Sequence, residues 1–240
     1  MKKADFVYIG RKLYEEGLVD SHSGGMSVRE GDEIYITRRD ISFSEITEED
    51  IIKVPLSNES PADKEVSREL PTHRYIYANT GAKVVVNAYP PHAIGLSITE
   101  NKIVPQDARA QDLIKGAPII RVREAVGSVE SGKYLVSNAY NNGYVVAMVK
   151  GYCSFAIGAT LEEAYKYTSC LESCCKVLFV VKTVEGVQKS AGRPSSDLGP
   201  RDRTSRMPSP GSRMHVGRDE RRSAIPPGIG VMDRSRRGRQ

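Results

Sequence analysis

A run of valines that ends in two prolines constrains the fold of this chain more than any other stretch. The β-branched residues 84–86 predict a buried strand, and the prolines must end it, because proline cannot donate a ladder hydrogen bond. Pro91 suits the first turn of a helix, which we expect to continue to Ser97. Along a strand, Asn87 and Tyr89 project to the same face. These two side chains therefore lie side by side at a strand end, where a site can form.

The rest of the chain, up to about residue 187, mixes strand and helix patterns. The capping box Thr160-Leu161-Glu162-Glu163 begins the longest predicted helix. Helices are expected over 5–16, 65–79, 107–114, 128–140 and 160–184, with a helix start at 47–50. Strands are expected over 26–29, 33–37, 52–56, 118–122, 144–150 and 154–157. The mixture, which includes a hairpin, predicts an α/β fold with a mixed sheet covered by helices.

Charge divides the chain into two parts. Residues 188–240 contain 13 lysines and arginines against five acidic residues, whereas every Phe and Tyr lies before residue 188. A segment of this composition cannot bury enough apolar area to offset the entropy lost on ordering. We therefore expect one folded domain over 1–187 and a disordered basic tail, rich in Arg, Pro, Gly and Ser, over 188–240.

Composition also narrows the class of protein. No run of about 18 apolar residues is present, so we expect no membrane span. The four cysteines lack metal-binding spacing and are interpreted as small buried residues in a reducing compartment, with the cytoplasm as the default location. The tail can contact RNA or another polyanion through charge, but without aromatic residues it has no stacking platform. The alternative is a solvated extension.

Taken in order, several short segments resemble the class II aldolase/adducin family, which includes fuculose-phosphate and ribulose-phosphate enzymes. The matching segments are 17–18, 23–29, 34–37, Glu69 with His73, 76–77, 85–97 and 158–164. The resemblance covers about residues 5–182. It implies a three-layer α/β/α fold around a mixed, mostly antiparallel sheet, and a homo-oligomer, often a tetramer, with sites between subunits.

The resemblance also shows where this chain departs from the family. Family enzymes hold a divalent metal with a His-x-His pair and a third histidine, and the corresponding positions here are Asn87, Tyr89 and Tyr152. An amide oxygen is a weak zinc ligand, and a phenol must first lose a proton of pKa about 10. We therefore expect no metal ligands among these residues, no zinc or other divalent metal of the family type, and no other cofactor.

Other family positions are altered or kept. Glu69 matches the catalytic glutamate, an acid/base beside the metal; the alternative role is a carboxylate stabilised by a helix dipole. The resemblance places the phosphate pocket at Gly24, Gly25, Arg39, Ser67 and Arg68. Arginines suit phosphate or carboxylate, but the same arginines can instead pair internally with Asp40.

Three functional hypotheses follow. The first is a non-catalytic binding or scaffold protein that keeps a pocket for a small, phosphate-like anion. The alternative is an aldolase-type lyase for a sugar phosphate or acidic sugar, with unusual or no metal ligation and Glu69 as its catalytic residue. The third is a nucleic-acid-associated factor whose folded domain multimerises the basic tail. The residues expected to bind the ligand are Gly24, Gly25, Arg39, Ser67, Arg68, Asn87, Tyr89 and Tyr152.

Overall fold

An eight-stranded sheet forms the centre of the protein in a computed structural model, which describes residues 2–191. In spatial order the strands are β3 (Ile51–Pro55), β2 (Glu33–Thr37), β1 (Gly25–Glu30), β4 (Val84–Ala88), β8 (Ser154–Gly158), β7 (Val146–Val149), β6 (Ala117–Ile120) and β5 (Lys102–Ile103). Only β6 and β7 pair in parallel. The predicted mixed, mostly antiparallel sheet is therefore confirmed.

Strand β4 carries the valine run and lies between β1 and β8. All five of its residues are buried. Since successive side chains alternate between faces, Val84 and Val86 belong to the apolar cluster on one side, whereas Val85 belongs to the cluster on the other. Pro91 then begins a helix, as the sequence predicted.

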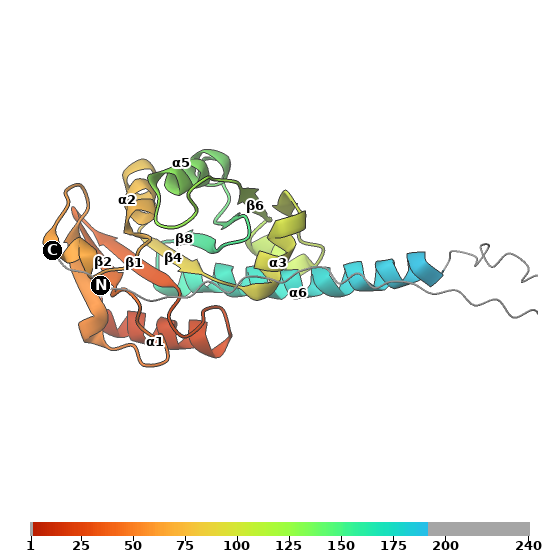
Figure 1. The fold of residues 1–240 in the computed structure, drawn as a ribbon, viewed down its shortest axis with the longest axis horizontal. Coiled ribbons are helices and arrows are strands. Elements are labelled where there is room, and N and C mark those ends of the chain that lie inside the picture. Colours follow the sequence, from red (N-terminus) through yellow and green to blue (C-terminus); the bar gives the residue numbers. More distant parts are fainter. Residues whose placement is uncertain (1, 192–240) are drawn as a thin grey trace, which may run out of the picture. The chain divides into compact units, whose positions relative to one another are not determined.

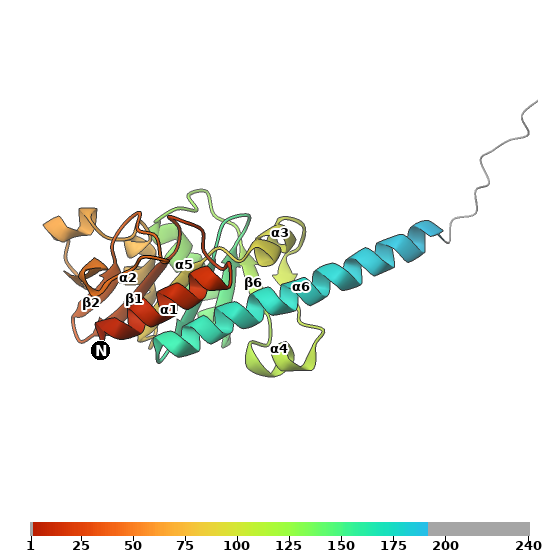
Figure 2. The same ribbon diagram turned by 90° about the horizontal axis from the view of Figure 1, so that it is seen from below.

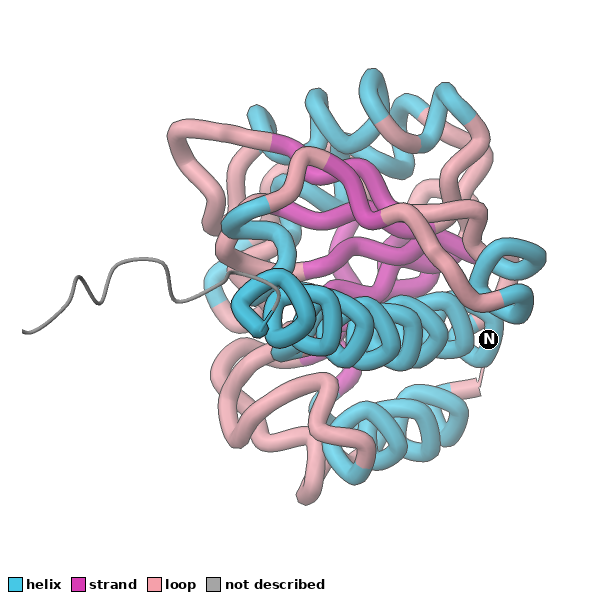
Figure 3. The backbone as a smooth tube through the Cα atoms, turned by 90° about the vertical axis from the view of Figure 1, so that its right-hand side faces the viewer, coloured by secondary structure: helices cyan, strands magenta, loops and turns pink. Residues whose placement is uncertain are grey.

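Helices cover both faces of the sheet, which gives the predicted three layers (Figures 1 and 3). The first face packs against α1 (Lys3–Glu15), α3 (Pro91–Thr99), α4 (Ala108–Leu113) and α6 (Leu161–Ala191). The second face packs against α2 (Leu70–Asn79) and α5 (Val129–Asn138). Single 3-10 turns, η1 (Glu48–Asp50), η2 (Pro61–Lys64) and η3 (Tyr140–Asn142), complete the regular structure.

Several predicted boundaries are wrong. Helix α2 begins at Leu70 and not at residue 65. Proline is accepted only in a first turn, so Pro71 places Glu69 just before the helix, as the sequence indicated. The helix start predicted at 47–50 is a single 3-10 turn, and the two-residue strand β5 was not predicted. Helix α6 continues seven residues beyond its predicted end at 184, since each added residue gains a backbone hydrogen bond once a helix exists.

Helix α6 extends past the predicted start of the basic tail. Residues 188–191 form the last turn of the helix, so the predicted boundary at 187 falls inside α6. From residue 192 onward, the predicted disordered tail lies outside the described residues. Within 2–191, no helix is long and apolar enough to cross a membrane. All four cysteines are unpaired and buried, in agreement with their interpretation as small core residues.

A glycine of α5 tests how closely α2 and α5 pack, and an exposed glycine of α3 serves as its control. A Cβ added at Gly132 of α5 would lie 2.7 Å from Tyr75 Cβ on α2, whereas a Cβ at Gly95 of α3 would meet nothing within 4 Å. Alanine favours a helix over glycine by about 1 kcal/mol, so Gly95→Ala should stabilise the fold by up to that amount. Gly132→Ala should destabilise it, because overpacking costs about 1–3 kcal/mol. Urea unfolding measures both; a stabilised Gly132→Ala protein would contradict the close helix packing.

Candidate functional site

A cavity of about 370 Å³ opens at the edge of the sheet where β4 ends. It is bordered by the loop before β1, the loop after β2, the start of α2 and the turn between β7 and β8. Six residues predicted for the site line it: Gly24, Arg39, Arg68, Glu69, Tyr89 and Tyr152. A larger cavity of about 930 Å³ lies at the opposite end of the strands, and none of the predicted site residues lines it.

Glu69 is the acidic group buried at the floor of this cavity. It occupies the N-cap position of α2, and only 2% of the residue is exposed. Its Oε1 accepts hydrogen bonds from the Tyr152 hydroxyl at 2.7 Å and from the Gly127 amide at 3.0 Å, while Oε2 accepts one from the Thr72 hydroxyl at 3.1 Å. Burial raises the pKa of this carboxyl above its ordinary value of 4.5, although the three donors oppose the shift. Glu69 is therefore a buried helix-start carboxylate of raised pKa.

Tyr89 and Tyr152 extend this hydrogen bonding across the cavity. The Tyr89 hydroxyl donates to the Tyr152 hydroxyl at 3.0 Å, and their rings meet edge to face. Burial, and then the charge of Glu69, raise the pKa of Tyr152, and burial also raises that of Tyr89. Both hydroxyls therefore stay protonated and form a chain of donors that ends at the Glu69 carboxylate.

Asn87, Ser67 and Gly25 lie beneath the cavity and do not line it. Asn87 is 1% exposed and pairs in the sheet with Gly25. A Cβ at Gly25 would lie 2.4 Å from Asn87 Oδ1 and 2.7 Å from Ser67 Oγ, so only glycine fits between them. Asn87, which we expected to bind the ligand together with Tyr89 and Tyr152, therefore does not line the cavity with them, because its amide lies against a different partner.

That partner is His73, which is fully buried on α2. Its Nε2 donates to Asn87 Oδ1 at 3.2 Å, and its Nδ1 accepts from Ser27 Oγ at 2.7 Å. Tyr77 continues the chain through its hydroxyl, 2.7 Å from Ser27 Oγ. Burial lowers the pKa of His73 to about 3, so the imidazole stays neutral and its two nitrogens are both used.

The arginines at the outer end of the cavity differ in their partners. Arg68 Nη2 lies 3.2 Å from Asp40 Oδ2, so the internal pair considered from the sequence exists for Arg68. Both side chains are more than half exposed, and such a pair contributes little to stability. Arg39 donates through Nε to the Val66 carbonyl. Its two terminal nitrogens have no hydrogen-bond partner within residues 2–191.

The donor set does not fit a metal of the family type. Asn87 Oδ1 is engaged by His73, and the Tyr89 and Tyr152 hydroxyls keep their protons. None of the three positions matched to metal ligands therefore offers a strong ligand, and Glu69 beside them is a single carboxylate. Across the described part of the chain, no group of three His, Cys, Asp or Glu side chains is arranged to hold an ion.

Sequence reasoning missed five residues of the cavity wall: His22, Ser23, Arg38, Asp40 and Val126. The first two belong to a small-residue loop before β1, which indicated an irregular segment but not its direction. Asp40 was considered only as a partner of the arginines; its φ of 57° is a left-handed conformation that favours glycine, which the sequence did not indicate. Val126 has no sequence signal, because only the fold brings its loop to this edge.

Comparison with known proteins agrees with this architecture. Residues 4–179 match the family model described as the class II aldolase and adducin N-terminal domain. The L-fuculose phosphate aldolase of Methanococcus maripaludis is 26% identical over 186 residues, which cover 77% of this chain and 100% of that protein. The structure of L-fuculose-1-phosphate aldolase from Thermus thermophilus aligns with a TM-score of 0.71 and 26% identity, covering 80% of this chain and 97% of the other. A sugar-phosphate aldolase from Thermotoga maritima, at 21% identity and TM-score 0.63, covers 80% and 96% and shows the same fold. The chain belongs to the class II aldolase/adducin family.

The raised pKa of Glu69 predicts a specific pH dependence of stability. A carboxyl whose pKa is higher in the folded state than in the unfolded chain stabilises the fold below the unfolded value, and this contribution is lost as pH rises through the folded value. The free energy of unfolding of the wild type, relative to Glu69→Gln, should therefore fall as pH rises above 4.5. Urea titrations at several pH values measure this difference. If this difference instead grows with pH, the three hydrogen-bond donors lower the pKa of Glu69 by more than burial raises it.

Proposed function

We propose that this protein is a binding or scaffold member of its family that holds a small anion in the cavity above Glu69. It does not cleave carbon–carbon bonds by a metal-dependent route. The observation that carries the proposal is the hydrogen-bonded chain from Tyr89 through Tyr152 to Glu69. By the family resemblance, Tyr89 and Tyr152 stand at two of the three positions that hold the metal.

Charge at the outer end of the cavity supports an anionic ligand. The guanidinium of Arg39 is anchored by a single bond to a backbone carbonyl, which leaves its fork of terminal nitrogens able to bind two oxygens. Arg68 is held only by an exposed pair with Asp40, which an incoming anion can replace at small cost. The relatives named above act on sugar phosphates by their names, and this makes phosphate the first anion to test.

The missing ligands argue against metal-dependent aldol chemistry. That reaction needs both a base and an electrophile that stabilises the resulting enolate. Glu69 can serve as a base, but neutral phenols and an engaged amide do not replace three imidazoles around a divalent ion. On this view Gly25, Ser67 and Asn87 support the floor of the cavity, and they do not contact the ligand.

The alternative is an aldolase-type lyase acting on a sugar phosphate or acidic sugar without the usual metal ligation. The bond of 2.7 Å between Tyr152 and Glu69 favours it, because a carboxyl of raised pKa beside a phenol can pass protons. Glu69 would be its catalytic residue. Turnover of a ketose phosphate to an aldehyde and dihydroxyacetone phosphate would establish this alternative.

The other proposals rest on the family and on composition. Resemblance to the family supports a homo-oligomer. The charge of residues 188–240 supports contact with RNA or another polyanion. Both proposals are independent of the cavity.

Metal content tests the loss of the metal site directly. We expect the purified protein to hold no stoichiometric zinc, manganese or iron, because no imidazole faces the cavity at the matched positions. Elemental analysis after dialysis gives the answer. About one tightly held ion per chain, removed by Asn87→Ala, would contradict the proposal, as would retro-aldol turnover that added metal stimulates.

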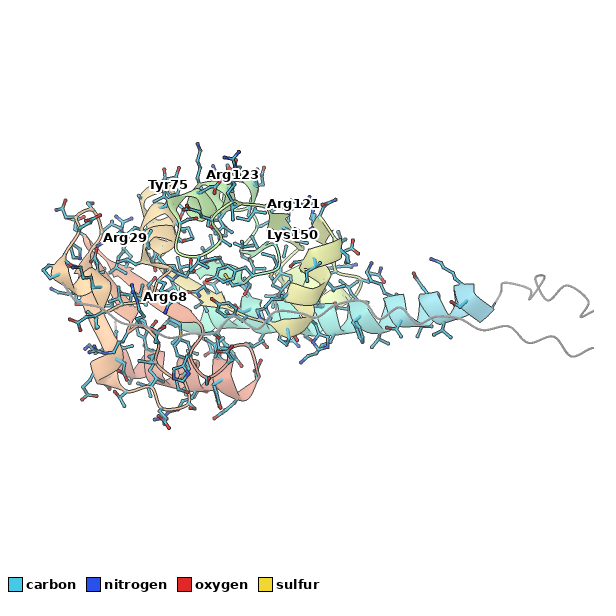
Figure 4. All side chains as sticks on the ribbon, viewed as in Figure 1. Arg29, Arg68, Tyr75, Arg121, Arg123 and Lys150 are labelled. Carbon is cyan, nitrogen blue, oxygen red and sulfur yellow. The ribbon has the colours of Figure 1, made fainter. Side chains whose placement is uncertain are left out.

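Anion binding is tested by comparing arginine pairs. Phosphate and sugar phosphates should raise the melting temperature of the wild type, and much less that of Arg39→Ala/Arg68→Ala, because charge-assisted bonds contribute about 1.5–3 kcal/mol each. The matched control is Arg121→Ala/Arg123→Ala. Both control residues are exposed and lie in the segment that follows β6, and Figure 4 shows them away from Arg68. Equal shifts in all three proteins would exclude the site.

A further inference from the structure

The C-terminal part of α6 carries an apolar stripe that nothing in the described chain covers. Figures 1 and 2 show this part of the helix extending beyond the other elements. Val177, Val180, Val184 and Val187 are 40%, 59%, 50% and 63% exposed. Single exposed valines are ordinary on a surface, but four in a row on one helix are not. We refer to these four residues as the valine stripe.

The spacing of the valine stripe is that of a coiled-coil seam. The residues follow one another at intervals of three, four and three, which are the a and d positions of a heptad repeat. Such a seam is complementary to another helix of the same kind, because each side chain fits between side chains of the facing helix.

Contacts with the domain fix the direction in which the stripe points. Leu171 and Leu178 of α6 are buried, and Lys182 binds Glu100 at the end of α3 with a distance of 2.7 Å. At 100° per residue, the valine stripe lies roughly 160° around the helix from these three residues. The valine stripe therefore lies on the side of α6 opposite to these three contacts.

Intrinsic helix preference does not explain this extension. Valine and glycine are poor helix formers, and Gly186 lies within the extension. A short helix without tertiary packing is marginal in water. The family match also ends at residue 179, before most of the stripe, so the family domain alone does not account for it.

We propose that the valine stripe joins copies of this chain through their α6 helices. Beyond Val177, the residues that flank the stripe, Thr183, Gln188 and Ser190, are uncharged, so two identical surfaces can approach without repulsion. Residues 192–240 are a poor alternative occupant. They contain twelve arginines, seven glycines and six prolines, a composition that does not support a second apolar helix. Coiled coils with isoleucine at both the a and d positions favour three or four helices. Valine is β-branched like isoleucine, so we expect the valine stripe to assemble more than two copies of α6.

The first test measures assembly of the full chain. Val180→Glu/Val184→Glu places charges in the seam, and sedimentation over a range of concentrations should show a lower mass and at least tenfold weaker self-association. The matched control, Gly186→Glu/Lys189→Gln, changes the net charge by the same amount on exposed positions off the stripe and should keep the wild-type mass. Unchanged melting of the domain in both variants shows that the fold is intact. Equal masses for the wild type and the seam variant would overturn the proposal.

Hydrogen exchange over residues 177–191 identifies what covers the stripe. Protection that survives deletion of residues 192–240 and disappears in the seam variant supports contact between copies. Protection that the deletion removes would assign the stripe to the chain's own C-terminal segment and overturn the proposal. Rapid exchange in the purified wild type would also overturn it, because the stripe would then be left for a different protein.

Discussion

The burial of β4 on both faces is the constraint on which the rest of this structure depends. Its alternating side chains contribute to both apolar clusters, so helices must cover both sides of the sheet. Because β4 has no solvent-facing side, Asn87 cannot reach water and must find a polar partner within the protein. His73 is that partner, and the buried chain through Ser27 to Tyr77 follows from it.

In the candidate site, three neutral groups donate hydrogen bonds to the buried carboxylate of Glu69. A metal ion would supply positive charge to Glu69, and here neutral donors take that place. Tyr152, Gly127 and Thr72 all donate to the carboxylate, yet burial still raises its pKa. Neutral donors stabilise an ionised carboxylate less than a divalent cation does. This difference is the physical basis of the proposal that the site binds an anion without stabilising an enolate.

Local patterns predicted most of the fold and part of the site. The valine run, the two prolines and the capping box before α6 gave the central strand and two helices with small boundary errors. The end of α6 was missed because residues 185–191 include Gly186, a poor helix former, and only Val187 continues the valine stripe there. Six of the residues that the resemblance indicated line the cavity. Val126 was missed because its loop is brought to the cavity only by the sheet.

The sequence by itself determined which chemical groups this protein has at the family positions: an amide and two phenols, a retained glutamate, and two arginines. It also determined the strand that carries Asn87, since β-branched residues favour a buried strand. Only the tertiary structure decided how these groups are used. Asn87 turned to His73, Arg68 paired with Asp40, and Glu69 gained donors 58 and 83 residues away in the chain. Contacts between such distant segments depend on how strands and helices pack, and no local pattern encodes them.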